Sequence, residues 1–467
     1  TYLFNCDTQL GSDLLSESDN VAADLLDFSA TLLQPININL GLTSLQVINP
    51  NLSLTLNSTS GFENVIGAAL GDSIVGNNRD NDLRGGAGND VLTGNSGNDF
   101  LAGGAGNDVY KFDADTPLGT DTLEESAGGT DTLDFSATTT VALTVDLSAG
   151  SNQVVNSNLT LNLGSGNVIE NVIGGAQGDV LTGNSLDNRL SGRGGSDTYV
   201  FDADAPLGTD TVDDQGNATD SDTLDFSQTT TQPITVGLST INPQAVNSNL
   251  VLIDNKSIEN VIGGAGDDEI VGDARSNILR GGPGNDFIDG GGGADFLYGE
   301  DGNDFIVPGG DGGVVDAGPG QDGIVLYGTP GDDDITIARG NGPIVLFTLN
   351  GKTTTIPYSN GETVFVYAGK GNDRVRMDAT GGAKWSAAFY GEKGNDTLIG
   401  SANDDLLNGG KGNDILIGGS GNDTLIGGPG HDLLFRGSVD DFLNGRHGKD
   451  IDRWNRARPT RWRHWNQ

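Results

Sequence analysis

The chain has 467 residues, of which 75 are glycine and 65 are Asp or Glu against 24 Lys or Arg, so its net charge is −41. This charge disfavours nucleic acid as a partner, because phosphates would meet an acidic surface, and no apolar run reaches the roughly 18 residues of a transmembrane helix. A single cysteine excludes an internal disulfide, while high charge with high glycine favours disorder unless the acids are regularly spaced.

Two sequence marks recur in the first 263 residues and predict three long modules. Leu-Asp-Phe-Ser stands at residues 26–29, 133–136 and 224–227, and Glu-Asn-Val-Ile-Gly stands at residues 63–67, 170–174 and 259–263. The interval between copies of the second mark falls from 107 to 89 residues, a difference of 18. Alternating stretches such as residues 141–147 predict longer strands. We expect the modules at 1–108, 109–197 and 198–325.

The first residues of the chain correspond to the middle of a coil. Thr-Tyr-Leu-Phe at residues 1–4 aligns with residues 109–112 and 198–201, which follow Asp108 and Asp197. We therefore expect the opening strand to expose a raw edge of parallel sheet, of the kind that solenoids normally cap.

A nonapeptide, Gly-Gly-x-Gly-x-Asp-x-Leu-x, runs through the modules and again through residues 391–453. Its Gly-x-Gly-x-Asp part allows the positive φ angles of a tight turn. The remaining three residues make a short strand with one inward apolar side chain. Nine residues then form half of a flattened coil and eighteen form a full one, so stacked coils predict two parallel sheets around a thin Leu/Ile core.

The aspartates of these turns fall into columns along both edges of the predicted stack. Unpaired carboxylates in a column repel one another, and carboxylates with turn carbonyls are the hard oxygen ligands that calcium takes. We expect ligands to pair across eighteen residues, Asp90 with the turn of Asp108 and Asp405 with that of Asp423. The predicted calcium ligands are Asp72, Asp90, Asp99, Asp108, Asp179, Asp197, Asp268, Asp286, Asp295, Asp304, Asp322, Asp373, Asp396, Asp405, Asp414, Asp423, Asp432, Asp441 and Asp450.

Two segments depart from the array. Residues 326–390 carry Asn350-Gly351, a hairpin signal, and we interpret the segment as irregular β coils rather than as a separate domain. Residues 446–467 hold seven Lys or Arg against two Asp, and residues 454–467 hold three of the four tryptophans. This tail is predicted either to cap the last coil or to dock on an acidic surface. RNA is disfavoured as a partner of the tail, because the acidic remainder of the chain would repel its phosphates.

The nonapeptide resembles the RTX (haemolysin-type) calcium-binding repeat, with more than fifteen copies in phase. The resemblance implies an all-β fold, a right-handed parallel β-roll or β-helix solenoid of stacked coils. Large bacterial secreted and surface calcium-binding proteins carry similar tandem units. We expect roughly fifteen to twenty Ca²⁺ ions, bound with Kd on the order of 10⁻⁴–10⁻³ M as in extracellular modules, and folding after export.

No catalytic constellation stands out in the sequence. The histidines are His431, His447 and His464, none in a His-Glu-x-x-His motif, and no Gly-x-Ser-x-Gly elbow is present, so no enzyme is expected. We expect a secreted, cell-surface, structural or adhesive solenoid that assembles head to tail into a layer or filament, with a surface glycan as a further candidate partner. The alternatives are the secretion and folding region of a larger toxin or enzyme, and an ice- or glycan-binding adhesin segment.

Overall fold

The computed structural model describes residues 1–17, 23–125, 128–164, 168–215, 220–239, 243–254, 258–309, 313–339, 344–357, 363–378, 385–437 and 440–453. The regular secondary structure in these ranges is β-strand throughout, and they include no helix that is long and apolar enough to cross a membrane. The chain divides into two compact units, residues 1–228 with 240–258 and residues 229–239 with 259–467. The division expected from the sequence, into residues 1–108, 109–197, 198–325, 326–390, 391–453 and 454–467, stays a prediction.

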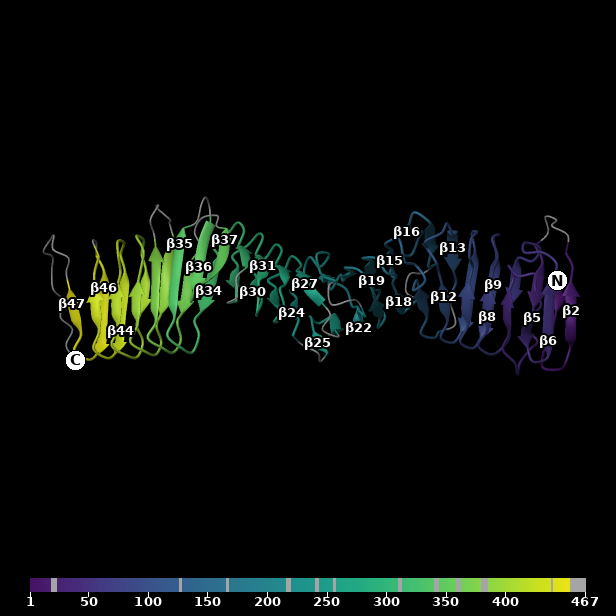
Figure 1. Ribbon diagram of the computed structural model, residues 1–467, viewed down its shortest axis with the longest axis horizontal. Helices are drawn as coiled ribbons and strands as arrows, with labels where there is room; N and C mark the ends of the chain where they lie inside the picture. Colours follow the sequence, from purple (N-terminus) through teal and green to yellow (C-terminus); the bar gives the residue numbers. More distant parts are fainter. Residues whose placement is uncertain are drawn as a thin grey trace. The chain divides into compact units, whose positions relative to one another are not determined.

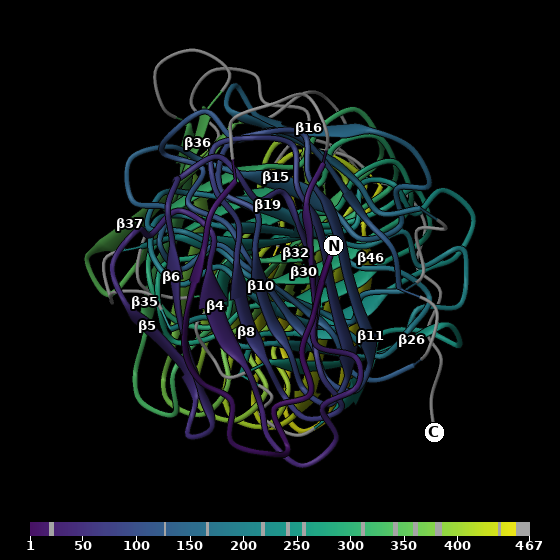
Figure 2. The same ribbon diagram turned by 90° about the vertical axis from the view of Figure 1, so that its right-hand side faces the viewer.

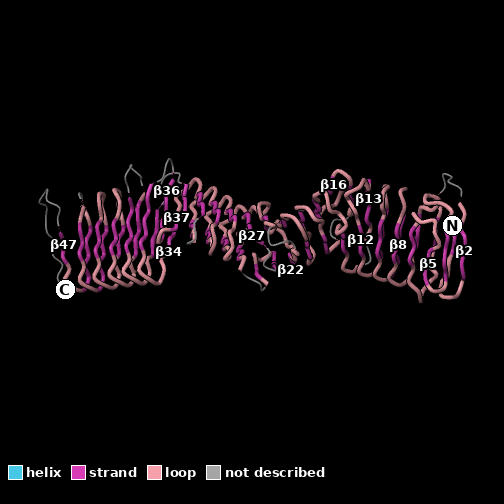
Figure 3. Tube along the Cα trace, in the orientation of Figure 1, coloured by secondary structure: helices cyan, strands magenta, loops and turns pink. Residues whose placement is uncertain are grey.

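The first unit is built from stacked strands that lie side by side in Figures 1 and 3. One sheet has the order β1 (Tyr2–Leu3), β3 (Leu25–Asp27), β7 (Asn64–Ile66), β9 (Asp82–Ala87), β11 (Phe100–Ala105), β13 (Gly119–Leu123), β17 (Leu159–Asn162) and β16 (Gln153–Asn156). A second has β4 (Asn37–Asn39), β8 (Ser73–Val75), β10 (Val91–Thr93), β12 (Val109–Lys111), β14 (Thr132–Asp134), β18 (Asn171–Ile173), β20 (Arg189–Ser191), β22 (Gly208–Val212), β26 (Leu250–Asp254) and β25 (Gln244–Ala245). Two shorter sets are β15 (Thr144–Asp146), β19 (Val180–Thr182), β21 (Thr198–Val200) and β23 (Asp222–Asp225), and β2 (Gly11–Leu15), β6 (Leu52–Leu56) and β5 (Gln46–Asn49).

The second unit repeats this architecture with two long rows of strands. One row has the order β27 (Ile258–Ile262), β29 (Ile278–Arg280), β31 (Asp295–Tyr298), β33 (Gly313–Asp316), β37 (Lys352–Pro357), β36 (Ile344–Leu349), β35 (Asp334–Arg339), β39 (Arg374–Asp378), β41 (Thr397–Ile399), β43 (Ile415–Ile417), β45 (Leu433–Phe435) and β47 (Ile451–Arg453). The other has β24 (Thr235–Gly237), β28 (Glu269–Val271), β30 (Phe287–Asp289), β32 (Phe305–Val307), β34 (Gly323–Tyr327), β38 (Thr363–Tyr367), β40 (Ser386–Tyr390), β42 (Leu406–Asn408), β44 (Thr424–Pro429) and β46 (Phe442–His447).

Neighbouring strands in the nonapeptide runs are parallel and eighteen residues apart. Val91 of β10 pairs with Ser73 of β8, and Ile415 of β43 pairs with Thr397 of β41. Figure 2 shows β4, β8 and β10 next to one another in that order. The predicted eighteen-residue coil with its parallel sheets is confirmed.

In the nonapeptide runs the core is formed by the inward leucine of each short strand. Leu92, Leu398 and Leu416 are the central residues of three-residue strands and are fully buried, as the nonapeptide pattern requires. In the long modules, phenylalanines from adjacent coils stack in equivalent pairs: Phe4 with Phe28, Phe112 with Phe135 and Phe201 with Phe226. These pairs confirm the alignment of residues 1–4 with the two later copies.

The segment between residues 326 and 390 continues the parallel rows and adds a hairpin. β34 pairs with β38 and β38 with β40 in parallel, whereas β36 and β37 are antiparallel around Asn350 and Gly351. These two turn residues have φ of 49° and 88°, the positive values that an Asn-Gly hairpin turn needs. The predicted hairpin is therefore confirmed.

The expectation of a longer strand over residues 141–147 is wrong. Only Thr144–Asp146 forms a strand, β15, because its partner β19 comes from a nonapeptide coil and offers only three pairing residues. The longer strands of the first unit lie elsewhere, for example in β6 and β26. The alternation of apolar and polar residues predicted which side chains point inward, but it did not predict the length of the strand.

Close stacking of the turns makes their glycines sensitive to substitution. A Cβ on Gly412, whose φ is +146°, would lie far inside 3.0 Å of the Gly394 carbonyl oxygen one coil away. We expect Gly412→Ala to lower the free energy of unfolding of the surrounding coils by about 2–4 kcal/mol, because the added atom forces adjacent turns apart. Gly331→Ala is the matched control, since no neighbour lies within 3.8 Å of its added Cβ. Urea unfolding in calcium measures both, and equal midpoints would contradict the expectation.

Candidate metal centre

The aspartates of the turns form columns along the stack, joined from coil to coil by main-chain hydrogen bonds. The Asp90 N–H donates to Asp108 Oδ1 at 2.7 Å, and the Asp405 N–H donates to Asp423 Oδ1 at 3.0 Å. In the C-terminal run, Asp396, Asp414 and Asp432 continue the pattern with bonds of 2.9 Å. Aspartates eighteen residues apart are therefore neighbours, as the sequence predicted, whereas their sharing of an ion stays a prediction.

The second carboxylate oxygen of most of these aspartates is buried and accepts no hydrogen bond. Asp90, Asp396 and Asp432 are 0% exposed, although each carries an Oδ2 atom without a hydrogen-bond partner. An ionised oxygen in that position costs several kcal/mol unless a cation or donor meets it. The predicted ligands with this arrangement are Asp90, Asp99, Asp108, Asp197, Asp286, Asp304, Asp373, Asp396, Asp414, Asp423 and Asp432.

The free oxygens face small oxygen-lined spaces kept open by glycine. A Cβ placed on Gly391 would lie closer than 3.0 Å to both Asp396 Oδ2 and the carbonyl oxygen of Gly409, one coil further on. Gly85 stands in the same relation to Asp90 Oδ2 and the Gly103 carbonyl. Carboxylate and carbonyl oxygens converge there without a donor between them. Such an oxygen set suits a hard cation such as calcium.

Burial makes the charge on these carboxylates costly in the absence of a cation. Desolvation, as the largest cause, raises the pKa of Asp90, Asp396 and Asp423 to about 7 and that of Asp197 to about 8. The hydrogen bond from the preceding coil lowers each pKa but does not offset burial, and carboxylates in adjacent coils raise it further. A divalent cation would remove both penalties at once.

Five of the predicted ligands are arranged differently. Asp72 accepts from the Ile36 N–H through Oδ1 and from the Ala68 N–H through Oδ2. Asp179, Asp268, Asp405 and Asp441 likewise accept main-chain N–H groups at both oxygens. Since protein donors already meet these carboxylates, the geometry gives their calcium role no support beyond the sequence pattern.

The last three predicted ligands lie in the same columns. Asp295 and Asp322 accept the N–H groups of Asn277 and Asp304, at 2.9 and 3.0 Å. Asp450 accepts the Asp432 N–H at 3.2 Å. These three therefore accept main-chain N–H groups like the other predicted ligands, with Asp295 as the first residue of β31.

Two further aspartates belong to the columns and were missed by the sequence reasoning. Asp121 in β13 accepts the Asp99 N–H at 2.9 Å, and Asp210 in β22 accepts the Asn188 N–H at 2.8 Å. Both have a buried Oδ2 without a hydrogen-bond partner, and burial raises their pKa to about 8 and about 7. An Asp followed two residues later by an apolar residue was the available signal. It was overlooked because the spacing to Asp99 is 22 residues instead of eighteen.

Asparagine takes the place of aspartate at three positions in the columns. The amide nitrogens of Asn81, Asn188 and Asn277 donate to the carbonyl oxygens of Glu63, Glu170 and Glu259, at 3.0, 3.1 and 2.8 Å. In these three turns a protein N–H group therefore already meets the main-chain oxygen.

Comparison with known families agrees with this geometry. A family model described as the RTX calcium-binding nonapeptide repeat matches residues 75–110, 171–205, 257–274, 271–306, 389–416 and 409–443. These matches contain Asp90, Asp108, Asp396, Asp414 and Asp432, whose free oxygens are buried. A search of curated proteins returned no match.

Proposed function

We propose, from the premise that this chain belongs to the RTX calcium-binding nonapeptide-repeat proteins, that it is a structural solenoid folded by calcium outside the cell. The buried, unpartnered Oδ2 atoms of the columns support the proposal most directly. Carboxylates of this kind need a divalent cation at neutral pH, and extracellular modules bind calcium with Kd on the order of 10⁻⁴–10⁻³ M. Cytosolic calcium is far below that range, so the chain folds after export.

A structural role follows from the repetition. Within the nonapeptide runs, each coil presents turns and short strands similar to those of the coil before it, and such stacks act as extended spacers or binding surfaces. The calcium ions in this role hold turns together and take no part in catalysis. We therefore propose a non-catalytic, adhesive or scaffolding element at the cell surface.

Assembly with a second copy is part of the proposal. Strands β1 and β2 stand at the ends of their sheets, and Leu3 and Leu14 on them are 75% and 69% exposed. Exposed leucines of this kind favour association with an apolar surface. The partner surface we propose is the basic end of another copy, which includes exposed Arg446 and Lys449 and the Trp-rich residues 454–467, which lie outside the described residues. A head-to-tail contact of this kind propagates into a filament.

Deletion of residues 454–467 tests the assembly. In millimolar calcium, the intact chain is expected to form filaments under the electron microscope, and the truncated chain is expected to sediment as a folded monomer with unchanged circular dichroism. Replacing only Asn466 and Gln467 by serine is the control and should leave the filaments intact. An intact chain that sediments as a monomer, or a truncation that loses β structure, would contradict docking through the tail.

A further inference from the structure

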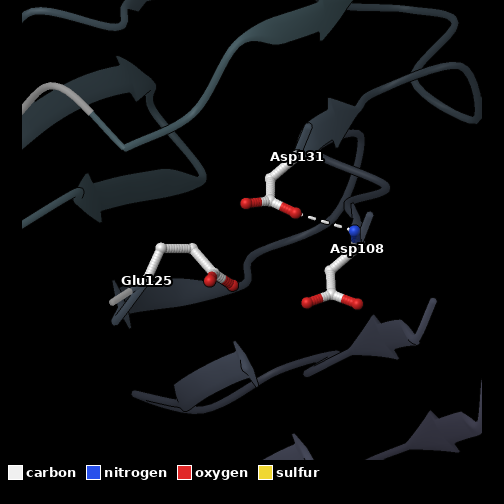
Figure 4. A group of neighbouring side chains, drawn as sticks. All are labelled: Asp108, Glu125 and Asp131. Atoms are coloured by element: carbon white, nitrogen blue, oxygen red, sulfur yellow. Dashed lines mark hydrogen bonds between the residues drawn. The ribbon is translucent and has the colours of Figure 1, made fainter. Parts of the chain in front are cut away.

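Three carboxylates converge at the end of a nonapeptide run, and the same arrangement occurs twice in the first unit. One oxygen each from Asp108, Glu125 and Asp131 lies within 4.8 Å of the others. Figure 4 shows these three side chains. Asp197, Asp214 and Asp222 form an equivalent group. Neither Glu125 nor Asp214 belongs to a nonapeptide, since each lies just beyond a strand of the long module.

The first group is held by main-chain contacts that leave oxygens free. The Asp108 N–H donates to Asp131 Oδ1 at 2.7 Å, the dashed line in Figure 4. Asp108 itself is 0% exposed, and its Oδ2 has no hydrogen-bond partner. Glu125 Oε2 is also buried without a partner. Two residues of the group, Asp108 and Glu125, therefore each carry an unpartnered oxygen.

The second group repeats these contacts with a different residue. The Asp197 N–H donates to Asp222 Oδ1 at 2.8 Å, and Asp197 Oδ2 is buried without a hydrogen-bond partner. Here Asp214 stands where the first group has Glu125. The intervals after these residues differ, six residues to Asp131 and eight to Asp222. The two modules thus bring three carboxylates together through loops of different length.

A buried tyrosine positions the third carboxylate in each group. Most nonapeptides have a leucine two residues after the column aspartate. After Asp108 and Asp197 this position is occupied by Tyr110 and Tyr199, both 0% exposed. The Tyr110 hydroxyl accepts the Gly103 N–H at 2.7 Å and donates to Glu125 Oε1. The Tyr199 hydroxyl accepts the Gly192 N–H at 2.9 Å and donates to Asp214 Oδ1 at 3.5 Å. The tyrosine thus spans the turn and orients one carboxylate oxygen.

The three adjacent carboxylates of each group repel one another strongly. The group must therefore take up protons or a cation. Three carboxylates at this spacing carry the charge and the oxygen atoms that calcium coordination requires.

We propose that each of these two carboxylate triads, Asp108–Glu125–Asp131 and Asp197–Asp214–Asp222, holds one calcium ion. These sites differ from those of the nonapeptide turns, because Glu125 or Asp214 supplies a side-chain oxygen where a nonapeptide supplies a glycine carbonyl. They lie where a repeat run meets a long module, so calcium joins the two kinds of coil. The inference rests on the proposed calcium-dependent fold and gives the ions at Asp108 and Asp197 a ligand set of their own.

The number of bound ions tests the inference. Glu125→Gln and Asp214→Asn are each expected to lose one calcium per chain, and the double variant two, in equilibrium dialysis at millimolar calcium with elemental analysis. Glu124→Gln is the matched control, since Glu124 is exposed beside Glu125 and should lose none. An unchanged ion count in the double variant would overturn the inference. If no form of the chain bound calcium, the proposed function itself would fail.

A second measurement applies if the carboxylate variants do not fold. Terbium replaces calcium and emits when excited through a nearby tyrosine, so the probe is Tb³⁺ alone. The double variant Tyr110→Phe and Tyr199→Phe is expected to lower the tyrosine-sensitised emission at unchanged ion number, because these rings contact the triads. Tyr327→Phe is the control, with its ring 56% exposed in β34. Equal emission from both variants would overturn the inference.

Discussion

Removal of calcium at neutral pH is expected to unfold most of the chain. At a calcium concentration ten times Kd, each site contributes roughly 1.4 kcal/mol to stability. The eleven predicted ligands with a free buried oxygen would then supply about 15 kcal/mol if each held one ion, as much as the entire stability of a typical domain. Circular dichroism in EGTA at pH 7.5 should show a largely disordered chain, and millimolar calcium should restore the β signal.

Magnesium at the same concentration is the control for this experiment. Mg²⁺ prefers octahedral geometry with short bonds and gives up its waters reluctantly, so it should restore much less β structure than calcium. A chain that keeps its full β signal in EGTA would contradict the calcium-dependent fold. Equal recovery with both ions would show that the columns respond to divalent charge alone.

Acid is expected to restore part of the fold in the absence of calcium. The pKa of Asp414 is raised to about 6, those of Asp90 and Asp396 to about 7, and that of Asp197 to about 8, mainly by burial. In the unfolded chain these groups have a pKa near 3.9. The folded chain therefore binds more protons at intermediate pH, so the free energy of unfolding falls as pH rises. This stability is fully present below about pH 4 and is lost between about pH 6 and pH 8.

The calcium-loaded chain should respond to pH in the opposite direction. Calcium needs ionised carboxylates, so its affinity falls on acidification. Urea unfolding of the metal-free chain at pH 5 and pH 8, in chelator-treated buffer, should give the higher midpoint at pH 5. With calcium, the higher midpoint should be found at pH 8. A metal-free chain that is equally unstable at both values would contradict the role assigned to the buried carboxylates.

The sequence by itself determined the coil and its repeat. One inward leucine and one turn aspartate in every nine residues suffice to predict eighteen-residue coils, because short strands and glycine turns can satisfy that period only by stacking. Leu398 and Leu416 are buried for that reason, and Asn350-Gly351 forms its hairpin through local turn chemistry. These features depend on contacts that are close in sequence or strictly periodic.

Tertiary structure alone decided which oxygens are left without partners. Asp268 and Asp286 share the Gly-Gly-x-Gly-x-Asp motif, yet Asp268 accepts two main-chain N–H groups while Asp286 keeps a free oxygen. Glu125 and Asp108 come together although the interval between them, 17 residues, is not a multiple of nine. The nine-residue period cannot predict such contacts, because strand pairing decides which residues become neighbours. Neighbouring aspartates of adjacent coils are 18, 22 or 23 residues apart in the sequence.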